Sequence, residues 1–265
     1  MENMKNIIIL FIIILGSIFI IFFNFEDKEE IKGKLRIGVS DDTSGFVINY
    51  MVNRDYFENI KVSDIMDIFT INDCWASTMQ WALSSEEIDI AIICKDAAKQ
   101  YVNVNSGFEI VGTVVQNSDI FLLSDNNPEK IGVIQNRDYQ SELVKKYYKN
   151  VEVAPLLGTA LAYGLESNLV DGVVIDCIKS IGLEGKRKST TKLGDYDTYV
   201  LVVNKEFKKS KAYSDFITLY NKSVDALKNK ATFKKVLKEY RNIRNIDMEE
   251  ISNWKLKFLK IKAID

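Results

Sequence analysis

The fold of this chain is best predicted from the stretch LSSEEIDIAIIC, residues 83–94. It is typical of a helix end, a polar turn, an aspartate (Asp89) at the start of a strand, an apolar run and then Cys94. A similar stretch, LESNLVDGVVIDC at residues 165–177, again has an aspartate (Asp171) before the strand and a cysteine (Cys177) after it. Two similar lobes built from βαβ units explain the repeat, although the ordinary regularity of α/β proteins produces the same pattern.

Outward from these stretches, short apolar runs rich in β-formers alternate with helical patterns. We expect strands at residues 35–39, 66–71, 88–93, 130–134, 151–154, 172–175 and 198–203, and one or two more within 110–123. Helices are expected at 45–56, 139–149 and 159–166, around Trp75, Met79 and Leu83, and in the lysine-rich end after residue 205. In that end Tyr213, Phe216, Tyr220, Val224 and Leu227 form an apolar stripe, so the lysines are expected on the solvated face of a helix. The alternation predicts an α/β fold.

Composition excludes several function classes. The chain has 265 residues and a formal net charge of −2, so we expect no nucleic-acid partner. It contains no histidine, which excludes Ser-His-Asp and Cys-His catalysis and zinc sites with imidazole ligands. An enzyme that uses Cys74 as a nucleophile is therefore the weaker hypothesis, because no ordinary base accompanies the thiol.

Residues 7–23 form an apolar run interrupted by Gly16 and Ser17, with Lys5 before it and acidic residues after it. Its length is the minimum for a transmembrane helix, and the charges place the following chain outside the cell. We expect residues 1–25 to be a membrane anchor or a signal, and residues 26–33 a linker. A cleaved signal peptide is the competing interpretation, although no A-x-A-like site follows the run. Either way, the predicted location is the extracytoplasmic face of the bacterial cell membrane.

Several segments, in this order, resemble the type II periplasmic binding proteins of ABC transporters, in the sulfonate, nitrate and thiamine-precursor branch. They are KLRIGV at 34–39, NRDYFE at 53–58, SEEIDIA at 85–91, VVQN at 114–117 and KIGV at 130–133. The resemblance implies lobe 1 at residues 34–124 and 200–265, lobe 2 at 125–199, and two hinge crossovers near 121–124 and 198–202. It also implies that the C-terminal helices pack on lobe 1.

The same resemblance implies a non-enzymatic protein, monomeric, with an ABC permease as its partner and a small ligand in the cleft between lobes. A narrower likeness involves Asp73, Cys74 and Trp75. This segment resembles the substrate-binding (seleno)protein of a proposed selenocysteine-assisted organometal transport system. The family's usual ligand is an organic anion, so a sulfonate-like or pyrimidine-like solute is the alternative.

The three cysteines, Cys74, Cys94 and Cys177, each follow a predicted strand. Open α/β sheets bind ligands beyond the carboxyl ends of their strands, and thiolates select soft metals. We therefore predict that these cysteines bind a thiophilic metal or organometal, as transported ligand and not as a resident cofactor. Two other interpretations stay open: Cys94 as a buried core residue, and a disulfide between Cys74 and Cys94.

Other candidate ligand-binding residues lie in the loops after the first strand of each lobe. Ser40, Asp41 and Thr43 follow strand 35–39, where hydroxyls and amides suit an anion, although Thr43 or Ser44 capping the next helix explains the same residues. Gln135 and Arg137 follow strand 130–134. Arg137 is suited to pair with an anionic group, and a surface arginine is the alternative. Trp75 and Asp73 complete the candidate ligand-binding set.

Overall fold

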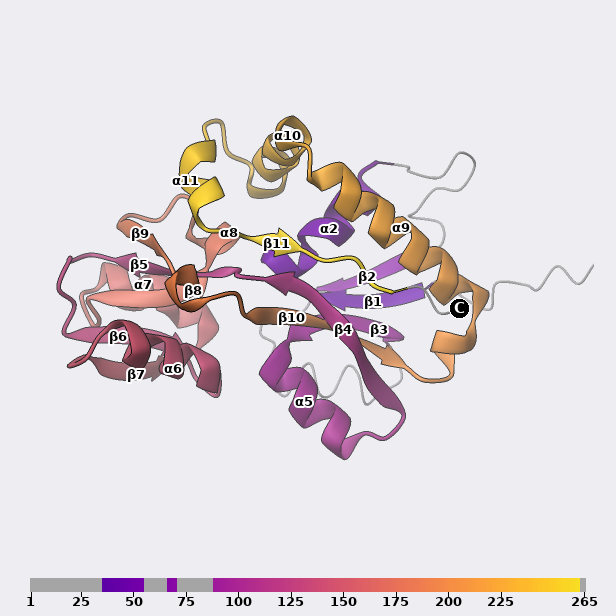
Figure 1. Ribbon diagram of the computed structural model, residues 1–265, viewed down its shortest axis with the longest axis horizontal. Coiled ribbons are helices and arrows are strands. Elements are labelled where there is room, and N and C mark those ends of the chain that lie inside the picture. The colour runs from indigo at the N-terminus through magenta and orange to yellow at the C-terminus, as the bar shows by residue number, and fades with distance from the viewer. Residues whose placement is uncertain (1–34, 55–65, 71–87, 263–265) are drawn as a thin grey trace, which may run out of the picture. The chain divides into compact units, whose positions relative to one another are not determined.

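The computed structural model describes residues 35–54, 66–70 and 88–262, which form two β-sheets flanked by helices (Figure 1). The first sheet has the order β11-β4-β10-β3-β1-β2 and the second β7-β6-β8-β5-β9. The first contains β1 (Leu35–Val39), β2 (Met66–Thr70), β3 (Ile90–Cys94), β4 (Phe108–Gln116), β10 (Asp197–Asn204) and β11 (Lys257–Phe258). The second contains β5 (Asp119–Leu123), β6 (Lys130–Ile134), β7 (Glu152–Leu156), β8 (Gly172–Asp176) and β9 (Lys186–Ser189).

The α/β prediction is confirmed, and two predicted strands, 35–39 and 130–134, have the observed bounds. The helices are α2 (Thr43–Val52), α5 (Lys95–Val104), α6 (Asp138–Tyr147), α7 (Leu161–Glu166), α8 (Cys177–Ser180), α9 (Lys211–Leu227), α10 (Lys230–Arg241) and α11 (Met248–Asn253). Short 3-10 helices lie at Gly158–Ala160, Thr191–Leu193 and Phe207–Lys209. The predicted helix 159–166 is thus split into a 3-10 turn followed by α7.

Both sheets are mixed. β1 pairs in parallel with β2 and β3, while β10 runs antiparallel between β3 and β4. In the second sheet β6 pairs in parallel with β7 and β8, while β5 runs antiparallel between β8 and β9. Because β1, β3, β6 and β8 are parallel within their sheets, the segments that follow them lie at one edge of each sheet.

The chain passes from the first sheet to the second at residues 117–118 and returns at residues 190–196. Asn117 has a φ of 62°, a left-handed conformation that asparagine tolerates. Its side chain accepts a hydrogen bond from the backbone N–H of Tyr196 (3.0 Å) and donates to Asp195 (2.8 Å), which joins the two crossing segments.

The crossovers expected near 121–124 and 198–202 were therefore misplaced. Residues 121–123 lie within β5, and residues 198–202 lie within β10. Both strands are buried throughout these residues, and a continuous apolar run contains no turn signal that marks where the chain leaves one sheet. The polar pair Asn117 and Ser118 is the signal that could have located the first crossing.

Alternation along β5 directs side chains to the two faces of the second sheet. Phe121 and Leu123 belong to a cluster with Leu143 and Val144 of α6. Ile120 and Leu122 belong instead to the larger core, which also contains residues of α7, α8 and the first sheet. Helix α6 therefore covers one face of the second sheet, and the other face shares its core with the first sheet.

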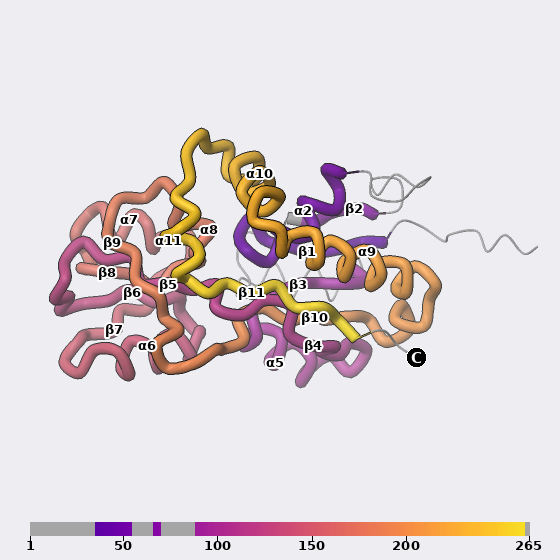
Figure 2. Tube along the Cα trace, turned by 45° about the horizontal axis from the view of Figure 1, so that its top comes forward, coloured from indigo at the N-terminus to yellow at the C-terminus, as the bar shows by residue number. Residues whose placement is uncertain are grey.

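The predicted apolar stripe of residues 213–227 is confirmed. Its five members are buried, and α9 packs on α2 together with α10 (Figure 1). The C-terminal helices were expected to pack on lobe 1, but α11 also contacts the second sheet. Glu250 of α11 pairs at 3.8 Å with Arg187 of β9 in that sheet. Figure 2 follows this C-terminal segment from α10 through α11 to β11, which pairs with β4 of the first sheet.

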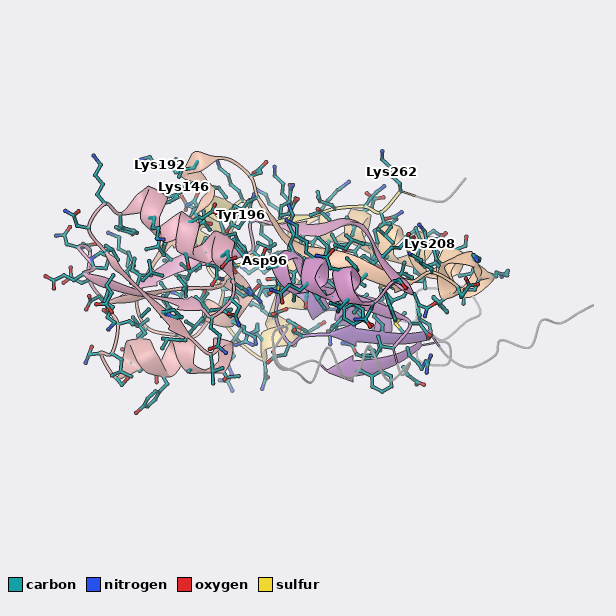
Figure 3. All side chains as sticks on the ribbon, turned by 90° about the horizontal axis from the view of Figure 1, so that it is seen from below. Asp96, Lys146, Lys192, Tyr196, Lys208 and Lys262 are labelled. Carbon is teal, nitrogen blue, oxygen red and sulfur yellow. The ribbon has the colours of Figure 1, made fainter. Side chains whose placement is uncertain are left out.

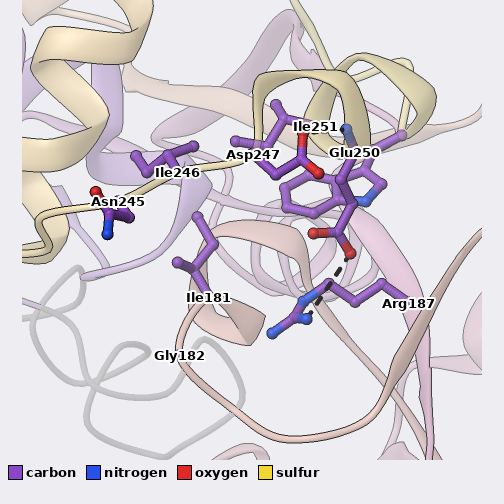
Figure 4. A pocket seen from close by; sticks show the side chains of 9 residues that line it. Ile181, Gly182, Arg187, Asn245, Ile246, Asp247, Glu250 and Ile251 are labelled. Atoms are coloured by element: carbon purple, nitrogen blue, oxygen red, sulfur yellow. Dashed lines mark hydrogen bonds and ion pairs between the residues drawn. The ribbon is translucent and has the colours of Figure 1, made fainter.

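Arg187 also donates to the backbone oxygens of Ser180 (2.6 Å) and Leu183 (2.7 Å). A small cavity of about 140 Å³ lies beside this contact (Figure 4). The residues that line it are Ile181, Gly182, Arg187, Asn245, Ile246, Asp247, Glu250, Ile251 and Trp254. No helix among the described residues is long and apolar enough to cross a membrane, and the predicted anchor, residues 7–23, lies outside them.

Candidate functional site

The segments after β1 and β8 meet directly, although they belong to different sheets. The hydroxyl of Thr43 donates to Asp176 Oδ1 at 2.8 Å, and the backbone N–H of Thr43 donates to the same oxygen at 3.3 Å. Thr43 Oγ1 also lies 3.8 Å from Cys177 Sγ. Nearby, Lys179 pairs with Asp41 at 2.8 Å. The structure thus brings three of the predicted site residues, Asp41, Thr43 and Cys177, to one junction.

Helix capping and close backbone packing fix the conformation of the segment after β1. Asp42 caps α2 by accepting from the backbone N–H of Ser44 (2.9 Å), so the capping residue is neither Thr43 nor Ser44 as the sequence suggested. Gly45 is required in the first turn of α2, because a Cβ there would lie 2.1 Å from the carbonyl oxygen of Ser40. Ser40 itself is buried, and its backbone N–H donates to Ser44 Oγ at 3.2 Å.

Two buried carboxyl groups face each other at this junction. The hydroxyl of Tyr199 lies 2.8 Å from Asp42 Oδ2 and 3.4 Å from Asp176 Oδ2. Burial, followed by the nearby charges of Asp42 and Asp119, raises the pKa of Asp176 to about 8. Asp176 is therefore mainly protonated at neutral pH, which relieves the repulsion between the two groups.

A third buried carboxyl, Asp119, begins β5 beside the first crossover. It is 1% exposed, and its Oδ2 accepts from the Tyr139 hydroxyl and from Gln140 Nε2 (2.8 Å). The other oxygen, Oδ1, has no hydrogen-bond partner. The Tyr196 hydroxyl donates to the backbone oxygen of Asp119 at 2.9 Å. The sequence interpretation did not single out Asp42, Asp119 or Asp176, although Asp119 starts β5, Asp176 ends β8 and Asp42 lies in the loop after β1.

Arg137 is a buried residue and not a surface arginine, since it is 4% exposed. Its guanidinium lies 5.9 Å from the centre of the Tyr199 ring and 3.5 Å from the Tyr139 hydroxyl. Gln135 is half-buried, and its backbone N–H donates to Leu156 O (2.8 Å). The positive charge of Arg137 thus lies among buried tyrosines and close to Asp119, with which Tyr139 is hydrogen-bonded.

The two cysteines within the described residues lie in the core. Cys94 ends β3 and Cys177 begins α8, and both are fully buried. Burial, and then the charge of Asp176, raises the pKa of Cys177 well above its usual value, so its thiol is protonated at neutral pH. Within the described ranges, no group of three or more cysteine, aspartate or glutamate side chains is arranged to hold a metal ion. Cys74, Asp73 and Trp75 lie outside those ranges, so the three-cysteine site stays a prediction.

A cavity of about 560 Å³ lies between α5 and α6. Its walls come from the first sheet's helix α5, from the second sheet's helix α6 and from the crossover that precedes β10. Tyr196 and Asp96 are labelled in this region in Figure 3. The lining residues are Lys95, Asp96, Lys99, Asp138, Tyr139, Glu142, Asp195, Tyr196 and Asp197.

No family model and no curated protein sequence matches the chain. Solved structures do resemble it. The zinc-bound ligand-binding component of an ABC-type import system from Staphylococcus aureus is 12% identical with a TM-score of 0.66, over 87% of this chain and 86% of that one. The alkanesulfonate-binding protein of Xanthomonas axonopodis pv. citri, bound to MOPS, is 13% identical with a TM-score of 0.60, over 84% and 83%.

A nutrient-binding protein from Burkholderia cenocepacia, bound to methionine, is 14% identical with a TM-score of 0.56, over 76% of this chain and 98% of that one. At these identities the likeness shows the fold alone, which is the mixed α/β, two-sheet fold of periplasmic binding proteins. The ligands named for the three structures are a metal ion, a sulfonate buffer and an amino acid. The fold therefore does not determine the class of ligand.

Proposed function

We propose that this chain, which has the fold of periplasmic binding proteins, is the extracytoplasmic solute-binding component of an ABC importer. The observation that carries the proposal is the cavity of about 560 Å³ between α5 and α6, at the strand ends of two sheets linked by two crossovers. Ligands of α/β proteins bind at such strand ends, and a cavity of this volume suits a small solute.

The proposal includes a location and a partner. Residues 7–23 would hold the protein at the outer face of the cell membrane, or direct its export before cleavage. The partner would be a membrane permease that receives the solute when the two sheets separate. Transfer without chemical change is the expected outcome, because binding and release are all that this role requires.

The proposed role predicts that the two sheets move together when solute binds, and this movement can be measured. Small-angle scattering of the full chain in detergent should show a smaller radius of gyration for the soluble part when solute is bound, because both crossovers must bend together. Mass spectrometry of the released solute should show an unchanged molecule. A radius of gyration that is the same with saturating solute would contradict the proposal, as would a chemically altered product.

A more specific hypothesis is that the chain captures a thiophilic metal through Cys74, Cys94 and Cys177. It requires a change in the state of Cys177. Cys177 would have to lose its proton and become exposed, which opposes both its burial and its raised pKa. Cd²⁺ binding under reducing, oxygen-free conditions tests this directly. Cys74→Ser should abolish most Cd²⁺ binding and Cys177→Ser should weaken it, whereas unchanged affinity in both variants would end the metal hypothesis.

A further inference from the structure

Helix α10 carries four basic side chains along one side, which we call the basic stripe. They follow one another at spacings of four, four and three residues and are Lys230, Lys234, Lys238 and Arg241. With 3.6 residues per turn, these positions lie within an arc of about 80° on the helix. None of the four forms an ion pair in the part of the chain that the structure describes.

Neighbouring lysines, by contrast, have acidic partners. On α9, Lys211 pairs with Asp215 at 3.1 Å. On α10 itself, the lysine outside the stripe, Lys235, lies 3.9 Å from Glu239. The uncompensated positive charge of α10 is therefore concentrated in the basic stripe.

The adjoining face of α10 is packed against the first sheet and α2, which fixes the direction of the stripe (Figure 1). The Phe233 ring lies 5.4 Å from that of Phe46 on α2 and 6.3 Å from that of Phe258 on β11. The Tyr240 hydroxyl donates to the backbone oxygen of Asp42 at 3.0 Å. The stripe lies beside this packed face, and its members are exposed or half-buried. Their charged groups are thus held in a row on one surface.

The basic stripe opposes the stability of its own helix. Lys230 lies in the first turn of α10, where the positive end of the helix dipole repels a cation. Like charges four residues apart also repel each other, as Lys234 does with Lys230 and Lys238. Arg241 Nε is in addition buried without a hydrogen-bond partner. Helix stability therefore does not account for the stripe, whereas an anionic partner outside the chain does.

The N-terminal sequence points to a lipid surface as that partner. The predicted anchor, residues 7–23, is joined to β1 by the nine residues 26–34, which span at most about 30 Å. The five residues of β1 extend over about 16 Å, and Tyr240 of α10 contacts the backbone just beyond the carboxyl end of that strand. An anchored chain therefore keeps the basic stripe within reach of the lipid headgroups.

We infer that the basic stripe of α10 binds anionic lipid headgroups at the outer face of the membrane. This inference rests on the proposed function, from which it takes the location of the protein. Headgroup phosphates would supply the negative charge that the stripe lacks, and each Lys or Arg near an anionic bilayer strengthens binding by about fivefold. Binding at this surface orients the two sheets relative to a permease in the same membrane.

The full chain, reconstituted through its anchor into vesicles, tests the inference. One set of vesicles is phosphatidylcholine alone, and the other contains about one third phosphatidylglycerol. Acetylation by an N-hydroxysuccinimide ester, followed by mass spectrometry, measures the reactivity of each lysine. Lys230, Lys234 and Lys238 should react at least about fivefold more slowly in the phosphatidylglycerol vesicles. About 0.5 M NaCl should remove the difference, because salt screens the attraction.

Two lysines at the end of α6 serve as the internal control. Lys145 and Lys149 are exposed, lie four residues apart and form no ion pair among the described residues. Their reactivity should be the same in both kinds of vesicle.

Two double variants test the charge itself. The double variant Lys234→Gln, Lys238→Gln should restore the reactivity of Lys230 in phosphatidylglycerol vesicles, because it removes two charges of the stripe. The matched double variant Lys145→Gln, Lys149→Gln should leave Lys230 protected. The comparison of the two kinds of vesicle uses the wild type, so it decides the question even if a variant fails to fold.

Equal reactivity of the stripe in both kinds of vesicle would overturn the inference and leave an acidic protein surface as its partner. Slowing that affects Lys145 and Lys149 equally, or that persists when Lys234 and Lys238 are replaced, would also overturn it. Flotation of the vesicles separates this inference from the proposed function. A chain that floats with both kinds of vesicle without slowing contradicts the inference alone, whereas a chain that floats with neither contradicts the proposed location and the inference with it.

Discussion

The hydroxyl of Thr43 donates a 2.8 Å hydrogen bond to Asp176, joining the end of β1 in one sheet to the end of β8 in the other. The donor begins α2 and the acceptor caps α8, so the same bond links the starts of two helices. Any opening of the cleft at this junction must break it.

Thr43→Val should destabilise the folded protein by about 1 kcal/mol, because it removes one neutral hydrogen bond while keeping the shape of the side chain. Asp176 Oδ1 keeps its bonds from the backbone N–H groups of Ile178 (3.0 Å) and Lys179 (3.3 Å), which limits the loss. Urea unfolding measures the effect. Thr218→Val is the control, because the Thr218 hydroxyl donates to Ser214 O on the exposed face of α9 (3.0 Å). An equal loss in both variants would show that the junction bond stabilises the fold no more than an exposed hydrogen bond does.

Stability should fall as the pH rises toward 8, because of Asp176. Its pKa is about 8 in the folded protein and 3.8 in the unfolded chain, so between these values the folded state binds more protons. The resulting stabilisation is complete below pH 3.8 and is lost as the pH rises through about 8. The difference in unfolding free energy between the wild type and Asp176→Asn, which cannot titrate, should shrink across this window. Asp42→Asn should move the window to lower pH, and a pH-independent difference would refute the assignment.

Cys177 should resist alkylation in the native protein. It is fully buried and burial raises its pKa, so both access and thiolate formation are suppressed. Iodoacetamide labelling followed by mass spectrometry should detect modified Cys177 only after denaturation. Ser214→Cys places an accessible thiol on α9 and serves as the reference for reagent reactivity. Native labelling of Cys177 at the rate of that reference thiol would contradict the closed junction.

Arg187 and Glu250 should contribute unequally to stability, although they form one ion pair. Arg187→Met should cost about 2 kcal/mol, because the carbonyls of Ser180 and Leu183 lose their charged donor. Glu250→Gln should cost less than about 0.5 kcal/mol, since the pair is 3.8 Å long and the Glu250 side chain is 39% exposed. Urea unfolding of both variants checks this, and similar losses would show that the ion pair dominates.

The sequence by itself determined where several helices and strands lie and which of their faces are apolar. Alternating apolar runs predicted β1 and β6 with their observed bounds, and the stripe from Tyr213 to Leu227 predicted a buried helix face. These features depend on the periodicity of side chains within one segment, which sequence displays directly. The repeated aspartate–strand–cysteine pattern likewise led to the prediction that ligand-binding residues directly follow the strands.

Only the tertiary structure decided which of those residues meet and what their surroundings do to them. The Tyr199 hydroxyl lies between Asp42 and Asp176, residues far apart in sequence, and no local pattern specifies that arrangement. Burial then changes the chemistry of Asp176 and Cys177, because the cost of removing a charge from water depends on every segment packed around it. Arg137 had the sequence context of a surface or anion-binding residue, yet packing places it among buried tyrosines. Sequence periodicity thus predicts segments, whereas long-range packing and desolvation determine the site.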